Sequence, residues 1–248
     1  MPCVLDEGIA SRARIGLVVL ASDHTVEHEF RQVVTMPGVA VYQTRIPNSP
    51  KITTHSLRAM AGDIAGQASV ILPGVELDVL AYGCTSASMV LGEDRVFELI
   101  KKGRPEARPT TPITAAFAAF RAFRSRRIGV VTPYSEDINR IVRRYFIDNG
   151  LKVPVFGSFN QTDVNRASRI SADSIRDAIM KIGSHTEVET VFLSCTSLRL
   201  TDTVHDIESQ LGKPVTSSNH ALIWHALRLA GVSEPINGYG SLYQLPAH

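Results

Sequence analysis

Short apolar runs alternate with amphipathic segments along the whole chain. Runs typical of buried parallel strands lie at 14–22, 39–46, 77–84, 126–133, 153–159 and 188–195. Segments in which apolar residues recur with helical spacing lie at 56–72, 94–102, 112–123, 135–150, 171–183, 203–212 and 218–231. Strands that alternate with helices in this way predict an α/β fold built on parallel sheets.

The pattern repeats between the two halves of the chain. "RIGLVVL" at 14–20 is similar to "RRIGVVTP" at 126–133, and Cys-Thr-Ser ends an apolar run twice, at 84–86 and at 195–197. From Gly16 to Cys84 is 68 residues (84 − 16), and from Gly129 to Cys195 is 66 (195 − 129). This internal repeat predicts two pseudo-symmetric lobes, each with a central, mostly parallel sheet flanked by helices.

The chain has no linker rich in glycine or serine, so the lobe boundary is expected in "GRPEARPTTP" at 103–112. We expect a first lobe at 1–111 and a second at 112–217. The C-terminal segment at 218–248 is expected to pack back on the first lobe. Thr111 is the expected N-cap of a helix that has Pro112 in its first turn.

Composition and charge exclude several classes of function. The 248 residues are 44% hydrophobic and 20% charged, with a formal net charge of +2. That charge is too small to favour nucleic acid or an acidic membrane surface as a partner. No apolar stretch approaches the roughly 20 residues that span a bilayer, and the N-terminus lacks the layout of a signal peptide. We therefore expect a cytoplasmic protein that has no membrane partner.

The cysteines are the candidates for chemistry. The chain has three, and in a reducing compartment a cysteine pair indicates catalysis or metal binding before it indicates a disulfide. His24 and His28 are four residues apart, but no third ligand is apparent, so no metal is expected. No glycine-rich phosphate loop follows the first strand, so no nucleotide is expected either.

Both Cys-Thr-Ser segments lie where ligands bind in parallel sheets, at the carboxyl ends of strands. Backbone N–H groups at such turns can hold a carboxylate, together with the hydroxyls of Thr85, Ser86, Thr196 and Ser197. The same setting is expected to lower a thiol pKa toward neutrality. Two facing lobes would place one thiol on each side of a substrate, one as base or nucleophile and the other as proton donor.

A simpler interpretation exists for each copy alone. A cysteine at a strand end is usually a small buried hydrophobe, and a following Ser or Thr is usually a helix N-cap. Two copies in matched positions of two half-chains are harder to explain by packing, so the repeat favours a function.

The chain resembles the aspartate/glutamate racemase superfamily, in the branch of maleate cis-trans isomerases and arylmalonate decarboxylases. The resemblance lies in the two Cys-Thr-Ser segments, in "VTPY" at 131–134 and in "PVTSSNHALIWHALR" at 214–228. It implies an active site between the lobes, no metal or organic cofactor, and Cys84 and Cys195 as the reacting pair. It also implies that Thr85, Ser86 and Tyr134 surround a substrate carboxylate. An even-numbered homo-oligomer is plausible from the resemblance alone.

Two positions bear on the substrate. The isomerases carry an Asn after the first strand, where this chain has Asp23. An ionised Asp only accepts hydrogen bonds, so it suits a substrate with an ammonium or amide N–H, although Asp23 could instead cap a helix. Asn165 lies near the second-lobe amide of the isomerases and is a weaker candidate for substrate binding.

Four functions therefore stay open. The first is a cofactor-independent, maleate isomerase-like enzyme acting on a small carboxylate. The second is a racemase or epimerase on an amino-acid-like substrate, as in the similar ectoine-utilisation proteins. The third is a decarboxylase, which Cys84 disfavours because decarboxylases of this branch lack the first-lobe cysteine. The fourth is a non-catalytic binder of small carboxylates.

Overall fold

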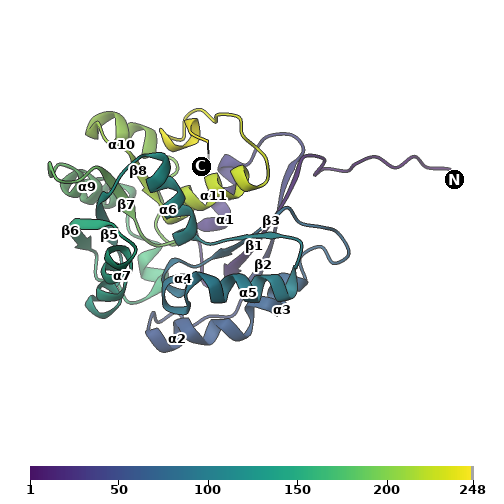
Figure 1. Ribbon diagram of the computed structural model, residues 1–248, viewed down its shortest axis with the longest axis horizontal. Helices are drawn as coiled ribbons and strands as arrows, with labels where there is room; N and C mark the ends of the chain where they lie inside the picture. The colour runs from purple at the N-terminus through teal and green to yellow at the C-terminus, as the bar shows by residue number, and fades with distance from the viewer. Residues whose placement is uncertain (247–248) are drawn as a thin grey trace.

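The computed structural model describes residues 1–246 and contains two four-stranded sheets within that range. The first sheet has the order β2-β1-β3-β4 and the second has the order β6-β5-β7-β8, with every neighbouring pair parallel. The two sheets therefore share one topology, which confirms the α/β class and the two-lobed plan (Figure 1). Their strands are β1 (Ala13–Leu20), β2 (Val39–Ile46), β3 (Val79–Gly83) and β4 (Arg108–Thr110), then β5 (Arg127–Thr132), β6 (Lys152–Ser158), β7 (Thr190–Leu193) and β8 (Val215–Ser217).

Helices cover both sheets and connect the parallel strands. The first half of the chain forms α1 (Val26–Val33), α2 (Thr54–Ala59), α3 (Ile64–Ser69), α4 (Thr85–Leu91), α5 (Glu93–Gly103) and α6 (Pro112–Ala122). The second half forms α7 (Glu136–Asp148), α8 (Val164–Ala167), α9 (Ala172–Gly183), α10 (Val204–Leu211) and α11 (Ser218–Leu229). Within residues 1–246, no helix combines the length and the apolar character needed to cross a bilayer.

Some of the local expectations were incomplete. The single helix expected at 56–72 is two helices, α2 and α3, separated by a 3-10 turn at Met60–Gly62. Gly62 ends this turn, and glycine has a low helix propensity, although Gly66 lies within α3. Strands β4 and β8 were not predicted, because each has three residues and neither forms an apolar run. Thr111 caps α6 as expected, with Pro112 at the start of that helix.

The two matched glycines of the repeat have a packing reason. A Cβ at Gly16 of β1 would lie 2.4 Å from the Leu80 side chain, and a Cβ at Gly129 of β5 would lie 2.4 Å from the Ile182 side chain. Real Cβ atoms do not approach neighbours so closely, so a side chain at either position would force its neighbours to move. The terminal methyl of Leu80 can move more easily than the Cγ2 of Ile182, so the constraint is stronger at Gly129.

Helix α11 packs against α6, α1 and β3, and its buried residues share one hydrophobic cluster with β1 and α1. Alanines 115, 118 and 119 give α6 a small face in the same cluster, while Ile113, Ala116 and Phe120 of α6 belong to the cluster that includes β5 and β7. Figure 1 shows α6 and α11 running between the two sheets. The boundaries at 111 and 217 stay a prediction, and the last two residues of the segment expected at 218–248 lie outside the described residues.

Candidate active site

Cys84 and Cys195 lie at the carboxyl ends of equivalent strands. Cys84 directly follows β3 and is the N-cap of α4, while Cys195 follows β7 by two positions. Both are free thiols, and their side chains are buried, with 4% and 5% of their surfaces exposed. The repeat therefore brings one thiol from each lobe to the same end of its sheet.

Both thiols line a single small cavity that is open to solvent on one side. Each Cys-Thr-Ser segment contributes all three residues to the wall, and Tyr134 contributes from the end of β5. The remaining lining residues are Leu20, Asn48, Ser49, Lys51, Ile52, Ser56, Leu57, Met60 and Val164.

Tyr134 and Ser86 lie in the cavity wall with the two sulfurs. The Tyr134 hydroxyl is close enough to the Cys195 thiol to lower its pKa, and Ser86 Oγ lies 4.0 Å from Cys84 Sγ. The backbone N–H of Ser197 donates to Cys195 Sγ at 3.4 Å. Burial raises the pKa of Tyr134 well above its ordinary value, so the phenol keeps its proton and acts as a donor.

Burial also raises the pKa of both thiols, to about 12 for Cys84 and in the same direction for Cys195. Donor groups oppose this shift, from Ala87 N–H at Cys84 and from Tyr134 and Ser197 at Cys195, but they do not outweigh the loss of solvation. The expectation of a thiol pKa lowered toward neutrality is therefore wrong. Position at a strand end and helix start says little about how completely neighbouring loops cover the sulfur.

The two carboxylate oxygens of Asp23 have different surroundings. Oδ1 accepts from the backbone N–H groups of Thr25 at 2.7 Å and Val26 at 2.8 Å, at the start of α1. Oδ2 is buried and has no hydrogen-bond partner within 3.5 Å among residues 1–246, although the Thr196 side chain is close enough to act on the carboxylate as a donor. Burial raises the pKa of Asp23, and its charge would raise the pKa of both Cys84 and Cys195. Asp23 thus caps the helix, and its carboxylate is close enough for its charge to act on both sulfurs, but it is not among the cavity-lining residues.

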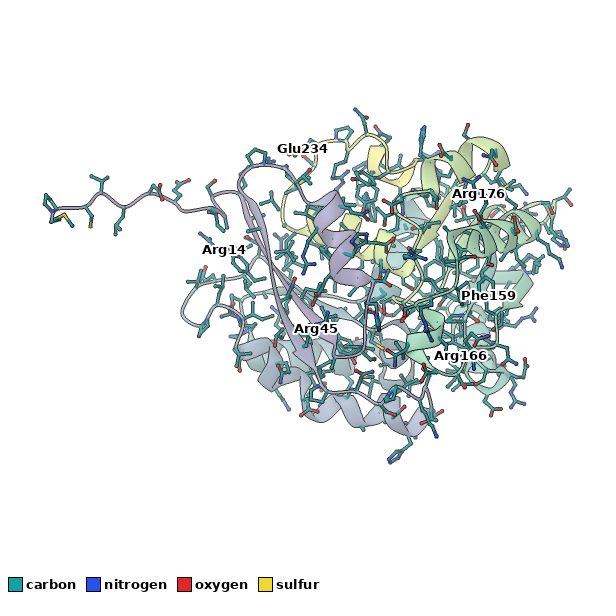
Figure 2. All side chains as sticks on the ribbon, turned by 180° about the vertical axis from the view of Figure 1, so that it is seen from behind. Arg14, Arg45, Phe159, Arg166, Arg176 and Glu234 are labelled. Carbon is teal, nitrogen blue, oxygen red and sulfur yellow. The ribbon has the colours of Figure 1, made fainter. Side chains whose placement is uncertain are left out.

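Arg45 of β2 holds the chain segment that precedes α1 (Figure 2). Its Nη1 donates to the carbonyls of Ala21 at 3.0 Å and Asp23 at 3.1 Å, and its guanidinium pairs with Glu27 at 3.0 Å. Arg45 therefore orients the backbone of Asp23, and its charge opposes the rise of the Asp23 pKa.

The remaining sequence candidates lie in different places. Thr85 Oγ1 donates to Ser218 Oγ of α11 at 2.7 Å, so this hydroxyl is already engaged. Asn165 of α8 is exposed and is not among the cavity-lining residues; its Oδ1 lies 2.9 Å from His24 Nε2 of the first lobe. Asn165 and His24 therefore join the two lobes outside the cavity wall.

Sequence reasoning missed how the first-lobe loop after β2 closes the cavity. Ile52 N–H donates to the Thr162 carbonyl at 3.2 Å, and Val164 N–H donates to the Pro50 carbonyl at 3.1 Å. These two bonds join loops from different lobes across the site. Lys51 lies in this loop and lines the cavity. The sequence "IPNSP", directly before Lys51, is typical of a loop. It does not indicate that this loop contacts the segment at 162–164 of the second lobe.

Comparisons with known proteins show the family and the relatives of this chain. The family model described as arylmalonate decarboxylase matches residues 53–243. The arylmalonate decarboxylase of Bordetella bronchiseptica is 30% identical over 136 residues, which cover 54% of this chain and 57% of that enzyme. The maleate isomerase of Pseudomonas putida is 23% identical over 242 residues, which cover 92% of this chain and 96% of that enzyme.

Solved structures show the same fold. The maleate isomerase Iso from Pseudomonas putida S16, a mutant with maleate, has a TM-score of 0.85 at 22% identity and covers 94% of this chain and 97% of its own. A mutant maleate isomerase of Nocardia farcinica, with a covalently bound succinylcysteine intermediate, has a TM-score of 0.85 at 24% identity, covering 94% of this chain and 98% of its own. Both lobes and their connection are thus shared with these enzymes.

Proposed function

The chain belongs to the arylmalonate decarboxylase family, and from this premise we propose that it is a cofactor-independent isomerase that uses Cys84 and Cys195 on a small carboxylate. The observation that supports this most is the placement of two free, buried thiols from different lobes in one cavity. Such a pair can supply a nucleophile or base on one side of a substrate and an acid on the other.

On a cis-enedioate such as maleate, the proposed reaction begins with addition of sulfur to carbon. The electron pair of the Cys84 thiolate forms the C–S bond, and the alkene π pair moves toward the far carbon and its carboxylate. The Cys195 thiol donates its proton to that far carbon, which leaves a single bond free to rotate. Cys195 then takes the proton back, the C–S electrons return to Cys84, and the trans alkene is released.

The charge that develops on the substrate carboxylate needs donors that are already in place. Ser86 and Tyr134 line the cavity beside the sulfurs, and the raised pKa of Tyr134 keeps its phenol protonated. Preorganised donors of this kind stabilise a transition state more than a ground state. Because the pKa of Cys84 is about 12, the thiolate fraction is small near neutral pH, and we expect the rate to rise with pH.

Asp23 also supports a second candidate, a racemase or epimerase on an amino-acid-like substrate such as those of ectoine breakdown. If Asp23 is ionised, its partnerless Oδ2 accepts an N–H from a substrate ammonium or amide. If Asp23 keeps a proton, as its raised pKa favours, Oδ2 donates to a carboxylate in the way an Asn amide would. A decarboxylase remains disfavoured because Cys84 is present.

The experiment that tests both candidates is solvent deuterium exchange at the reacting carbon, followed by NMR on maleate, aspartate, glutamate and diaminobutyrate derivatives. Cys84→Ser and Cys195→Ser should each abolish turnover and keep the fold, while the matched Cys3→Ser, at an exposed position, should leave turnover unchanged. Near-normal turnover in either of the first two variants would exclude the paired-thiol reaction. Absence of turnover and of deuterium exchange in the unmodified protein on every substrate tested would favour the non-catalytic binder.

Asp23→Asn separates the substrate classes. Asn supplies an N–H donor without charge, so turnover of a dicarboxylate should stay within about fivefold of the unmodified protein. Turnover of an ammonium-bearing substrate should fall about a hundredfold, because a charge-assisted bond is lost. A loss on dicarboxylates alone would contradict the protonated Asp23.

We also propose a cytoplasmic location, where both thiols stay reduced, and a homo-oligomeric state. The proposed lobes are residues 1–111 and 112–217, with 218–248 belonging to the first. Cell fractionation, light scattering and limited proteolysis test these three points.

A further inference from the structure

A buried carboxylate outside the cavity holds the loop that carries Cys195. Glu29 lies on α1 of the first lobe, with 1% of its surface exposed, and does not line the cavity. Its Oε1 accepts from the backbone N–H groups of Leu200 and Thr201, both at 2.8 Å, and its Oε2 accepts from Asn219 Nδ2 at 2.7 Å. Burying a carboxylate costs free energy unless such donors compensate for the lost solvation. The presence of Glu29 at this buried position therefore calls for a functional reason.

Asn219 links Glu29 to the Thr196–Ser197 peptide, which lies next to Cys195. Its Nδ2 also donates to the Thr196 carbonyl at 2.8 Å, so both hydrogens of the amide are used. In a trans peptide the C=O and the following N–H point in opposite directions. With the Thr196 carbonyl held toward α11, the Ser197 N–H points to the other side, where Cys195 Sγ accepts it at 3.4 Å.

A second attachment comes from the start of α1, the helix that carries Glu29. Thr25 Oγ1 donates to the Ser197 carbonyl at 3.0 Å. The segment from Thr196 to Thr201 is therefore held at both ends by polar groups of α1 and α11.

We propose that Glu29 is a positioning residue for Cys195: through Asn219 it fixes the Thr196–Ser197 peptide so that the Ser197 N–H points at the Cys195 sulfur. The thiolate form of Cys195 gains a donor that a freely turning peptide would not supply. This role rests on the reaction proposed for Cys195, but the hydrogen-bond chain itself is testable without any substrate.

Glu29→Gln is the main perturbation. Its single oxygen can still accept from Leu200 and Thr201, but its NH₂ group then faces the NH₂ group of Asn219. Two donors repel, so Asn219 turns away and releases the Thr196 carbonyl. The side-chain volume is unchanged, which limits the effect on packing.

Thiol reactivity is the readout, with methyl methanethiosulfonate as the probe at pH 8 and mass spectrometry as the detector. Cys195 is measured in a Cys3→Ser/Cys84→Ser background and Cys84 in a Cys3→Ser/Cys195→Ser background. Glu29→Gln should slow modification of Cys195 about tenfold, because the thiolate loses one donor, and should leave Cys84 within twofold. An unchanged or faster rate at Cys195, or equal changes at both thiols, overturns the proposal.

Two further variants separate positioning from general stability. Glu208 also accepts from two backbone N–H groups, those of Val215 at 2.8 Å and Ser241 at 2.6 Å, so Glu208→Gln is a matched control that should leave both thiol rates unchanged. Glu29→Gln/Asn219→Asp restores a bond between the two side chains, but provides no donor for the Thr196 carbonyl. Its melting temperature should recover while the slow rate at Cys195 persists; a rate that recovers with stability contradicts the role.

If Glu29→Gln does not fold, the same thiol-reactivity measurement is made on Thr25→Val. It removes only the hydroxyl that donates to Ser197 and keeps the side-chain shape. Slower modification of Cys195 with unchanged Cys84 supports the proposal, and equal rates at both thiols oppose it. With substrate, Glu29→Gln should lower kcat about tenfold and leave KM within threefold. A loss of kcat without the selective effect on Cys195 would overturn the positioning role and leave the paired-thiol reaction intact.

Discussion

His220 makes folding stability depend on pH in a window that the structure defines. Its ring is fully buried at the start of α11. Nε2 lies 2.8 Å from the Tyr239 carbonyl, which can only accept, so Nε2 carries the hydrogen. Nδ1 lies 3.0 Å from Thr216 Oγ1 and accepts from that hydroxyl. The neutral ring is thus satisfied, and burial lowers the pKa of His220 from 6.5 to about 4.

The sign and size of the effect follow from linkage. The unfolded chain takes up a proton below pH 6.5, whereas the folded chain resists it until about pH 4, so the stability contributed by His220 is complete above 6.5 and is lost between 6.5 and 4. A difference of one pKa unit corresponds to about 1.4 kcal/mol, so the full window represents roughly 3 kcal/mol. The pKa of His225 is lowered in the same direction, so this residue adds to the stability that is lost as the pH falls.

Urea denaturation at pH 7.5 and pH 4.5 measures this contribution, and His220→Gln isolates it. Gln can occupy both hydrogen bonds but does not titrate in this range. The unmodified protein should lose at least about 2 kcal/mol more than the variant between these two pH values. Equal losses of stability in the two proteins would refute the conclusion that His220 stays neutral when buried. A larger loss in the variant would mean that protonation of His220 stabilises the folded protein.

Two further predictions concern the site and the repeat. Tyr134→Phe should keep the fold and lower kcat about a hundredfold, because the donor beside Cys195 is removed; steady-state kinetics on the substrate that NMR identifies will measure this, and an unchanged kcat would exclude the role. Gly129→Ala should destabilise the protein by about 1–3 kcal/mol in urea, because its Cβ would overlap the Ile182 side chain. Gly62→Ala, where no atom lies within 4 Å of the new Cβ, is the control and should show no such loss.

Strand positions were well predicted where the strands are long and apolar, as in β1 and β5. The short strands β4 and β8 were missed because three residues leave no periodicity to detect. The pairing of the two Cys-Thr-Ser segments followed from the repeat, since equivalent positions in equivalent sheets end at equivalent edges. The placement of Asn165 outside the cavity wall depends on how α8 turns, which one sequence does not specify.

By itself, the sequence determined the α/β class, the two-lobed repeat and the position of each cysteine at a strand end. These follow from local patterns, because hydrophobic periodicity and turn residues act over a few positions. Tertiary structure alone decided that burial raises both thiol pKa values and that Glu29 and Asn219, 190 positions apart, meet beside the Cys195 loop. Solvation and hydrogen bonding depend on whatever groups packing brings together, and distant parts of the chain supply most of them.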